Sequence, residues 1–579
     1  MDALTENPTR VTGDQLQDEA LAAFAAGDPV IARQMLAAAL RLAPKDYNLQ
    51  YLQSIMLGAC GEPRLAEVAF ETATQAQIDD HLERLLGDGY AAFQETAAKL
   101  RELGMALYQK NQMSLAGDCF RQSIRKDPGN FEAWKMLGLA LQHQGRSDEA
   151  VNVFRTALQF WSSNAMLHSM LHYALCFGPR DHHELMIEGQ RWNAAHAAAR
   201  MPRPLQHGND RNPDRRLKIG YFSSIFSQHQ LSYFLEPVFS NHDRAAFEIY
   251  CYVSNDAPED PTQQRIQSMV DHWRPVATLN DAAMAQQIRD DGIDVLVDLW
   301  GHTIGNRLSA FAFKPAPVQV EWLNYGVTTG LEAMDYIFLA DNWYVPGDEA
   351  LFSEEIYTIG DIAAPFRTST VIRNPGKTPA LDKGHVTFGS YNHPGKITDR
   401  VVELWARILK GVPNSKLMLR YRYFEDLVTQ KRFEMRFFAH GIEAGRLVFA
   451  PHVSGAEYWT SFRDIDLALD SFPYQGYTTT FDALTAGVPL LSYEGDFHRE
   501  RPTPTVLRNC GLDSLVATCH DDYVARAIAL GSNPGELNRL RKIVGPALQG
   551  SSTADGAGFT LKLEAAYRDV FRRWCESAG

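Results

Sequence analysis

The sequence repeats itself with a period of 34 residues near its start. This spacing separates the pairs Gly104 and Gly138, Ala116 and Ala150, Phe120 and Phe154, Gly27 and Gly61, Ala32 and Ala66, and Ala39 and Ala73. A period of 34 residues is typical of tetratricopeptide helix pairs, in which small residues stand where two helices cross closely. Such pairs stack into a curved surface that usually holds protein segments. The period therefore predicts an α-helical repeat array over residues 1–165 whose partner is a protein.

The repeats differ in clarity along this array. Residues 97–130 and 131–164 match the pattern best, whereas residues 13–46 and 47–80 match it more weakly. Residues 81–96 interrupt the period, and we expect additional helix there. A general α-helical domain without repeats is the alternative, and a period shared by four segments disfavours it.

A helical extension and a linker are expected over residues 166–215. Residues 183–200 have the apolar spacing of an amphipathic helix. Residues 201–216 are rich in Pro, Asn, Asp and Arg, a composition typical of a linker.

The remaining sequence alternates strands and helices, and its continuous apolar runs indicate parallel sheets covered on both faces. We expect one Rossmann-like α/β domain over residues 216–375, a linker over residues 373–384, and a second such domain over residues 385–579, with its last helix (residues 558–575) packed back on the first. The expected strands are residues 217–224, 247–254, 293–300, 385–392, 416–422, 446–452, 467–472 and 488–493, and the segments VQVEWLNYG and MDYIFLAD. The predicted fold is therefore an α-solenoid followed by two α/β domains, whose sheets face a shared cleft at their carboxyl ends.

Composition excludes several classes of protein. The net charge of the 579 residues is −14 and no long basic tract occurs, so nucleic acid is not expected as a partner. No run of about 18 apolar residues predicts a membrane span, and the polar start MDALTENPTR does not resemble a secretory signal. The seven cysteines are scattered without a C-x-x-C, which indicates reduced thiols, a cytoplasmic location and no structural zinc.

A threonine-rich turn, QGYTTTFDALTAGVP, is the strongest candidate for chemistry. Gly476 permits a sharp turn before a predicted helix, and Asp482 follows in its first turn. The threonines between them are Thr478, Thr479 and Thr480. Free backbone N–H groups and the helix dipole at such a place favour a phosphate, and Asp482 suits a ribose hydroxyl. A capped helix without a ligand is the alternative, because Thr is a good N-cap residue.

Lys396 lies in the segment YNHPGKIT, directly after the strand expected at residues 385–392. That position is at the carboxyl end of the second sheet, where an ammonium group would neutralise the charge that grows on a leaving diphosphate. Most lysines are solvated surface residues. Because the threonine turn would flank the same switch-point crevice, we interpret the two segments together as one phosphate site.

Two histidines follow predicted strands of the first α/β domain. His229 lies in FSQHQLSYF after one strand, and His302 lies in WGHTIGNRL after another. A histidine at a strand end can act as acid, base or hydrogen-bond donor to a sugar or phosphate. A lone histidine in a loop is more often structural. Two histidines, each at the end of a strand, favour a functional interpretation without establishing it.

Five segments, in this order, carry a resemblance to a known family: IGYFSSIFSQHQLSYF, DLWGHTIGNRL, KPAPVQVEWLNYGVTTGLEAMDY, FGSYNHPGKIT and YQGYTTTFDALTAGVP. The chain resembles the SPINDLY and O-GlcNAc transferase family, which joins tetratricopeptide repeats to a two-Rossmann glycosyltransferase of the GT-B type. The resemblance spans the repeats and nearly all of residues 215–575. It implies an inverting enzyme that moves a sugar from a nucleotide-sugar donor to Ser or Thr of proteins.

The resemblance also implies roles, residue by residue. Lys396 matches the lysine that contacts the donor diphosphate, and Asp482 matches the nucleoside-binding aspartate. Thr478 and Thr479 match the pair whose backbone and hydroxyl groups hold the phosphates. His229 matches a histidine near donor and acceptor and is the first candidate for the base.

Other residues of the same motifs are expected near the donor. They are Asn392, His393, Gly476, Tyr477, Thr480 and Tyr325. His302 falls in the G-H-T segment typical of bacterial members and is the second candidate base.

Several positions depart from the family pattern. His393 stands where the family usually has Asn or Gln, and Tyr477 stands where the animal enzymes carry His. The loop that shapes the sugar pocket reads Asn-Tyr-Gly-Val at residues 324–327 in place of G-Y-P-G, which leaves the sugar open. RERPTPTVL, residues 499–507, departs from the usual R-x-x-A-S segment. The asparagine ladder of the animal repeats is absent at the aligned positions Asp18, Leu52, Glu102 and Met136.

The expected function is transfer of a sugar from a UDP-N-acetylglucosamine-like donor to a protein held by the repeats, without cofactor or metal. Lys396 and the amides of residues 478–480 would stabilise the leaving nucleotide, and the donor phosphate oxygens are a third candidate for the base. Asp464 and Asp466 mimic the D-x-D of metal-dependent transferases, but they lead straight into an apolar strand, so we interpret them as strand-entry residues.

Three alternatives stay open at this point, and a fourth is set aside. One is a flagellin-specific transferase that uses another donor, such as a CMP-linked nonulosonic acid. A second is a non-catalytic repeat scaffold that binds a nucleotide. A nucleotide-sugar epimerase of the same two-domain architecture would not need the helical array. An NAD enzyme is disfavoured because no strand ends in G-x-G-x-x-G.

Overall fold

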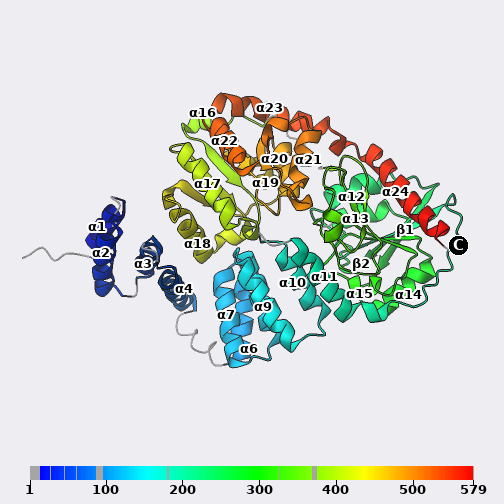
Figure 1. The fold of residues 1–579 in the computed structure, drawn as a ribbon, viewed down its shortest axis with the longest axis horizontal. Helices are drawn as coiled ribbons and strands as arrows, with labels where there is room; N and C mark the ends of the chain where they lie inside the picture. Colours follow the sequence, from blue (N-terminus) through cyan, green and yellow to red (C-terminus); the bar gives the residue numbers. More distant parts are fainter. Residues whose placement is uncertain are drawn as a thin grey trace, which may run out of the picture. The chain divides into compact units, whose positions relative to one another are not determined.

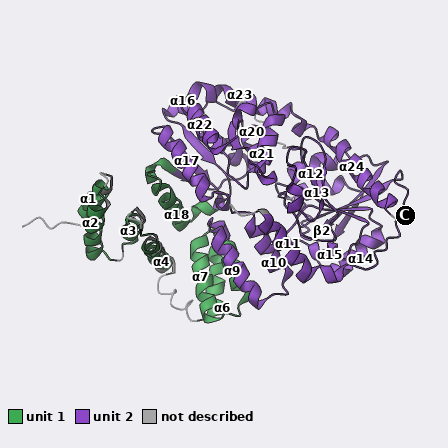
Figure 2. Cartoon of the chain, in the orientation of Figure 1, with its two compact units in different colours: residues 1–140, 423–447 green, residues 141–422, 448–579 purple. Residues whose placement is uncertain are grey.

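The computed structural model describes residues 13–25, 28–44, 46–59, 62–86, 96–178, 182–323, 325–367 and 375–577. The chain forms two compact units, one of residues 1–140 with 423–447 and one of residues 141–422 with 448–579 (Figure 2). This division differs from the predicted domains, whose boundaries stay predictions. In the part of the chain that is described, no helix combines the length and apolar character of a membrane span.

The first unit contains the predicted helix pairs. Its helices are α1 (Gly13–Ala25), α2 (Pro29–Leu42), α3 (Tyr47–Ala59), α4 (Pro63–Leu86), α6 (Ala97–Gln109), α7 (Met113–Lys126), most of α8 (Phe131–His143), and α18 (Leu427–Phe438). Helices α1 and α2, α3 and α4, and α6 and α7 pack as pairs. A β-carbon on Gly104 would lie only 2.6 Å from the Phe120 ring, so the period does mark a close helix crossing. Helix α4 extends to Leu86, and residues 87–95 lie outside the described residues.

Helix α18 belongs to this unit although its sequence lies between two strands of the second sheet. It packs on α4 and α7, and Met435 joins a buried cluster with Tyr51 and Ala73. The buried Asp426 caps α18 and also accepts hydrogen bonds from the backbone N–H (2.8 Å) and hydroxyl (2.6 Å) of Ser114 on α7. No sequence pattern predicted that α18 packs in the first unit, because each of these contacts joins residues hundreds of positions apart.

The second unit contains two parallel sheets. The first has the strand order β3-β2-β1-β4-β5-β6-β7, and its strands are β1 (Leu217–Ser223), β2 (Phe247–Val253), β3 (His272–Pro275), β4 (Val295–Asp298), β5 (Val318–Trp322), β6 (Tyr336–Leu339) and β7 (Glu355–Thr358). All the strand predictions for this sheet are confirmed. Strands β3 and β7 were not predicted, because these two edge strands have four residues each, contain no fully buried residue and lack a continuous apolar run.

The second sheet has the order β10-β9-β8-β11-β12-β13. Its strands are β8 (Thr387–Ser390), β9 (Lys416–Arg420), β10 (Leu447–Ala450), β11 (Leu467–Leu469), β12 (Leu490–Tyr493) and β13 (Val516–Ala517). Five of the six were predicted, and the two-residue β13 was not. Strands β8 and β11 are neighbours in the middle of this sheet, so the segments that leave their carboxyl ends start side by side.

Helices cover both sheets (Figure 1). They are α12 (Ser232–Phe239), α13 (Pro261–Ser268), α14 (Asp281–Asp291), α15 (Leu308–Phe311), α16 (Ala380–Lys383), α17 (Asp399–Gly411), α19 (Gly455–Ser461), α20 (Tyr477–Thr485), α21 (Pro502–Asn509), α22 (His520–Gly531), α23 (Pro534–Gln549) and α24 (Gly556–Glu576). Helix α24, red in Figure 1, packs on α12 and β5 of the first sheet, where Phe559 stacks on Trp322 with centroids 6.1 Å apart. The predicted return of the last helix to the first domain is confirmed.

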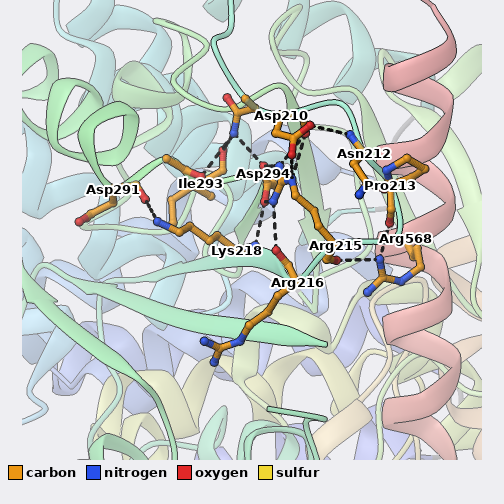
Figure 3. A network of polar contacts seen from close by, with 12 residues as sticks. Asp210, Asn212, Pro213, Arg215, Arg216, Lys218, Asp291, Ile293, Asp294 and Arg568 are labelled. Carbon is orange, nitrogen blue, oxygen red and sulfur yellow. Dashed lines mark hydrogen bonds and ion pairs between the residues drawn. The ribbon is translucent and has the colours of Figure 1, made fainter. Parts of the chain in front are cut away.

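A polar network ties the linker to the first sheet (Figure 3). Asp294 is fully buried and accepts hydrogen bonds from both terminal nitrogens of Arg215, at 2.7 and 2.5 Å, and from the Lys218 backbone at 2.9 Å. Arg568 of α24 donates to the Arg215 carbonyl at 3.1 Å. The linker, the first sheet and the last helix are therefore joined at one buried carboxylate.

Helices α9 (Ser147–Phe160), α10 (Ala165–Leu175) and α11 (His182–His196) lie in the second unit. Most of α10 and all of α11 fall within residues 166–215, where a helical extension was predicted. Buried histidines gather where α10 packs. His168 contacts His196 at 3.0 Å and Glu188 at 2.9 Å through its two ring nitrogens. His172 lies with its ring centroid 4.1 Å from that of His302, and burial lowers the pKa of His172 well below its ordinary value.

Candidate active site

The structure brings Lys396 and the threonine turn together. Lys396 ends the short helix η3 (Pro394–Lys396), and its Nζ donates to the Gln475 carbonyl at 2.9 Å. The Thr479 hydroxyl donates to Asn392 Oδ1 at 3.0 Å. These contacts join the segments that follow the neighbouring strands β8 and β11, as the order of a parallel sheet requires.

Asp470 and Gln475 hold the turn ahead of α20. The buried Asp470 accepts hydrogen bonds from the Gly476 backbone at 2.9 Å and from the Ser492 hydroxyl at 2.7 Å. The Gln475 side chain donates to the carbonyls of Tyr493 at 2.7 Å and Glu500 at 2.9 Å. Sequence analysis missed both residues, because the predicted strand at residues 467–472 extended over Asp470, whereas β11 ends at Leu469 and leaves Asp470 directly after the strand, where functional side chains often stand.

Gly476 is required for space and not for a left-handed turn. Its φ is −89°, which any residue adopts. A β-carbon there would clash with Thr479 Oγ1 and Asn392 Oδ1. The predicted need for glycine therefore holds for a different reason, the close approach of the turn to the segment after β8.

Three backbone N–H groups at the start of α20 have no acceptor within the described ranges. They belong to Tyr477, Thr478 and Thr479, and no side chain caps this end. A helix N-terminus with free N–H groups and its positive dipole end favours an anion. The half-buried Lys396 ammonium lies beside it, so the site concentrates positive charge where a phosphate would bind.

Thr480 does not contribute as predicted. Its backbone N–H and its hydroxyl both donate to the Gly476 carbonyl, each at 2.8 Å. The free N–H groups therefore begin one residue earlier than expected, at Tyr477. The prediction that Thr480 offers a free amide is wrong, because the first intrahelical bond already uses it.

Burial lowers the pKa of Lys396 to about 8, and the nearby Asp470 carboxylate opposes that shift. Its Nζ also lies 3.8 Å from the centroid of the Tyr474 ring, which stabilises a cation. A bound anion would favour the charged ammonium further.

Asp482 has one carboxylate oxygen bonded and one without a partner. Oδ2 accepts a hydrogen bond from the Tyr458 hydroxyl at 2.7 Å, whereas the buried Oδ1 has no hydrogen-bond partner in the described chain. Burial raises the pKa of Asp482 to about 7. Asp482 lies in the second turn of α20 and not in the first as predicted, and its free oxygen suits a ligand hydroxyl.

His393 is held by protein groups at both ring nitrogens. Nδ1 accepts from the Gly395 backbone at 3.0 Å, so Nε2 carries the proton and lies 3.0 Å from Nδ1 of His143. Burial lowers the pKa of His393 well below its ordinary value. This placement argues against the predicted contact between the His393 ring and the donor.

His229 and His302 occupy very different environments. His229 is exposed at the turn before α12, and its Nδ1 accepts from the Leu231 backbone at 3.3 Å. Desolvation by the surrounding protein lowers the pKa of His229 below its ordinary value. With Nδ1 as acceptor, Nε2 carries the proton, so this geometry favours His229 as a hydrogen-bond donor to a substrate oxygen.

His302 is a buried structural residue. Its Nε2 donates to the Thr329 carbonyl at 2.8 Å, and its Nδ1 accepts from the Ser169 hydroxyl at 2.9 Å. Burial lowers its pKa to about 3. Both nitrogens are used and the ring is only 1% exposed, so the structure contradicts the prediction of His302 as a second candidate base.

The two predicted tyrosines position neighbouring elements. The Tyr477 ring stacks on Phe234 of α12 with centroids 5.5 Å apart, while the Tyr477 amide is one of the three free N–H groups at the start of α20. The Tyr325 hydroxyl accepts from the His302 backbone at 3.2 Å, and its ring packs against Tyr173. Asn324 of the same loop lies outside the described residues.

The D-x-D-like pair is engaged by protein groups. Asp466 is fully buried and accepts from the backbone N–H groups of Ala380 and Thr387, each at 2.8 Å. Asp464 forms an ion pair with Arg420 at 3.0 Å. The two carboxylates thus hold different elements, as expected of strand-entry residues.

Comparison with known proteins agrees with this geometry. The sequence profile described as glycosyl transferase family 41 matches residues 168–360 and 367–562, and a tetratricopeptide repeat profile matches residues 101–165. The chain is similar to proteins of Petunia hybrida (34% identical over 372 residues, 64% of this chain and 40% of the relative) and Arabidopsis thaliana (33% over 379 residues, 65% and 42%). Both are described as probable UDP-N-acetylglucosamine–peptide N-acetylglucosaminyltransferase SPINDLY, and the chain spans about two fifths of their length.

A solved structure covers nearly the whole chain. It is a mutant of the O-GlcNAc transferase of Thermobaculum terrenum, 30% identical with a TM-score of 0.76 over 99% of this chain and 100% of that one. The predicted repeat array and paired α/β domains are confirmed by this similarity and by the two profiles. The family profile covers more than half of the sequence, and the chain therefore belongs to glycosyl transferase family 41.

Proposed function

We propose that this protein is an inverting O-glycosyltransferase that moves a sugar from a nucleotide-sugar donor to Ser or Thr of a protein. The observation that carries the proposal is the Lys396 ammonium beside three free amides at the start of α20. UDP-N-acetylglucosamine is the first donor to test, because the SPINDLY relatives are named for it.

The chemistry needs stabilisation of a departing anion. The acceptor hydroxyl oxygen would attack the anomeric carbon from the face opposite the phosphate, while the carbon–oxygen bond to the phosphate breaks and its electrons leave with the nucleotide. Lys396 and the amides of Tyr477, Thr478 and Thr479 would stabilise the negative charge that grows on that oxygen. Preorganised donors of this kind are usually the largest contribution to catalysis. The charge is supplied by the protein, so we propose that neither metal nor cofactor takes part.

The hydroxyl proton needs a separate route. His229 is the predicted base, but Nδ1 must first release the Leu231 backbone before it can take a proton. We propose that His229 Nε2 donates a hydrogen bond to a substrate oxygen and that a donor phosphate oxygen takes the proton. Asp482 would bind a ribose hydroxyl through its free Oδ1.

The acceptor would be a protein held by the tetratricopeptide repeats. The cysteines that the described ranges contain are free thiols, which supports a reducing compartment such as the cytoplasm. Flagellin is the first acceptor to test, since some bacterial relatives of this layout are expected to modify it.

Intact-mass analysis of acceptors tests the proposal. Candidate proteins are co-expressed with the wild-type chain or with Lys396→Ala, and the added mass is measured. A sugar-sized mass that requires Lys396 supports the proposal. Nucleotide binding without any added mass across the donors and acceptors tried would favour the non-catalytic scaffold instead. Conversion of the free sugar nucleotide to its epimer without any protein acceptor would favour an epimerase.

A further inference from the structure

Repeat helix α8 ends against the loop that carries Lys396. We call residues 393–396, from His393 to Lys396, the Lys396 loop. His143 is the last residue of α8, and its Nδ1 lies 3.0 Å from Nε2 of His393. The tetratricopeptide repeat profile at residues 101–165 includes α8, and α8 crosses into the second unit after residue 140. A helix of the repeats therefore reaches the Lys396 loop within the second unit itself.

The hydrogen bond between the two histidines has one direction. Nδ1 of His393 accepts from the Gly395 backbone at 3.0 Å, and burial holds the pKa of His393 well below its ordinary value. A neutral imidazole carries a single proton, which here stands on Nε2. His393 therefore donates to His143, and Nδ1 of His143 is the acceptor. The His393 ring thus links the Gly395 backbone to the end of α8.

The Lys396 loop is also packed closely against the end of α8. A β-carbon on Gly395 would lie 3.3 Å from the carbonyl oxygen of Gln142 and 2.9 Å from the Phe177 ring. The Phe177 ring centroid lies 5.3 Å from that of His393. The end of α8 and the loop therefore fit together without spare space, so a shift of one displaces the other.

The backbone that carries Lys396 is short. Lys396 ends η3, a single 3₁₀ turn of three residues, and its backbone N–H donates to the His393 carbonyl at 2.9 Å. A turn of this length makes few hydrogen bonds of its own, so its position depends on its neighbours. A misplacement of about 1 Å in a catalytic group can lower a rate about a hundredfold. The contacts that hold this turn therefore matter for the ammonium that it carries.

We infer that His143 is a positioning residue for Lys396 and acts through the hydrogen bond that it accepts from His393. The repeats thereby form part of the frame of the donor site, in addition to holding the acceptor. The inference rests on the proposed function, because the position of Lys396 matters only if its ammonium binds the donor phosphates. It assigns no contact between His143 and a substrate.

A matched pair of variants at residue 143 tests the inference by calorimetry with UDP. Asn and Leu have nearly the same shape, but Oδ1 of Asn stands where His has Nδ1 and can accept from His393. We expect His143→Leu to weaken UDP binding about tenfold, which corresponds to one weakened charge-assisted hydrogen bond between Lys396 and a phosphate. His143→Asn should bind UDP nearly as tightly as wild type.

A double-variant cycle separates positioning of Lys396 from a general loss of stability. UDP affinity is measured for wild type, His143→Leu, Lys396→Ala and the double variant. If His143 acts through Lys396, the double variant binds UDP no more weakly than Lys396→Ala alone, because coupled residues are not additive. The control combines His143→Leu with Lys410→Ala, at the exposed end of α17, and should show only the loss caused by His143→Leu.

Three outcomes contradict the inference alone. Wild-type affinity in His143→Leu shows that the Lys396 loop does not need α8. Equal losses in His143→Leu and His143→Asn assign the effect to packing and not to the hydrogen bond. Additive losses in the double variant show that His143 does not act through Lys396. Absence of UDP binding by wild type, or unchanged binding by Lys396→Ala, instead contradicts the proposed function, and the inference fails with it.

Thermal unfolding shows which variants are folded. His143→Leu and His143→Asn should unfold at similar temperatures, because each replaces the same half-buried ring by a side chain of the same size. If His143→Leu does not fold, His143→Ala takes its place, since alanine favours a helix and also lacks an acceptor. Weakened UDP binding by the folded variant without an acceptor, together with retained binding by His143→Asn, supports the inference.

Discussion

Lys396 combines burial with a positive charge, which is an unusual condition for a lysine. Among the described residues, its ammonium is stabilised by the Gln475 carbonyl, the Tyr474 ring and the nearby Asp470 carboxylate. A bound anion, as proposed above, would offset the free-energy cost of burying this charge. The residue-scale predictions below depend on this balance.

Replacing Lys396 by Ala should reduce the rate of sugar transfer about a hundredfold or more, because one preorganised donor to the leaving group is lost. The melting temperature should not fall, since the substitution removes a buried charge. The matched control is Lys410→Ala at the exposed end of α17, which should keep the wild-type rate. Near-normal transfer by Lys396→Ala would refute the assignment.

The pH dependence of nucleotide binding should show two groups. Asp482 ionises with a pKa of about 7, so its carboxylate becomes a full acceptor for a hydroxyl only above that pH. Lys396 loses its proton with a pKa of about 8, so its attraction for phosphate weakens above that pH. We expect affinity for UDP to be greatest between pH 7 and 8. In Asp482→Asn, the loss of affinity on the acid side of this range (the acid limb) should disappear. An unchanged acid limb in that variant would exclude Asp482 as its source.

Sequence predicted the residue types of the site better than their atomic roles. Lys396, Asn392 and the threonine turn lie together because both segments follow central parallel strands, a rule that sequence patterns reveal. The exact start of α20 could not be predicted, because helix ends shift by a residue with local hydrogen bonding. His302 was misjudged because its burial depends on Ser169, a residue 133 positions away.

At the scale of elements, the close contact between the turn before α20 and the segment after β8 fixes the site. Gly476→Ala should displace Thr479 and Asn392, because a β-carbon would overlap their side-chain oxygens. We expect UDP affinity to fall at least tenfold with little loss of secondary structure. Calorimetry and circular dichroism measure the two effects, and wild-type UDP affinity would show that the turn tolerates the methyl group.

The histidine-rich packing of α10 should make the protein sensitive to acid. Burial lowers the pKa of His302 to about 3, so in the folded state the ring stays neutral while the unfolded chain takes up a proton below its ordinary pKa. Stability is therefore complete above about pH 6.5 and is lost as the pH falls, by about 2 kcal/mol for this residue at pH 5.

The variant His302→Gln tests this expectation, because the amide can still donate to the Thr329 carbonyl. Denaturant unfolding at pH 7 and pH 5 should show a smaller loss for the variant than for wild type. Equal losses would exclude His302 as a source of acid sensitivity.

The buried strands of both sheets were predictable because their apolar runs are long and continuous. Strands β3 and β7 were not, since each has only four residues of mixed polarity and lies at the sheet edge. Residues 427–438, which form α18, were assigned to the second α/β domain. The packing of α18 on α4 and α7 depends on contacts such as that between Asp426 and Ser114, which no local pattern encodes.

At the scale of the whole molecule, the network around Asp294 joins the linker, the first sheet and α24 within the second unit (Figure 3). Arg215→Ala would leave this fully buried carboxylate without its ion pair, and we expect the free energy of unfolding to fall by about 3 kcal/mol. Arg407→Ala, which removes an exposed pair, should cost less than about 1 kcal/mol. Denaturant titration measures the free energy of unfolding of both variants. Similar losses in the two would show that the network around Asp294 stabilises the fold no more than an exposed ion pair does.

The packing of α18 with the repeats has a consequence for biosynthesis. The first unit needs residues 423–447, so a ribosome must make three quarters of the protein before that unit can be completed. The chain also passes between the two units three times, after residues 140, 422 and 447. A single proteolytic cut at any one of these crossings would leave the units covalently linked through the other two.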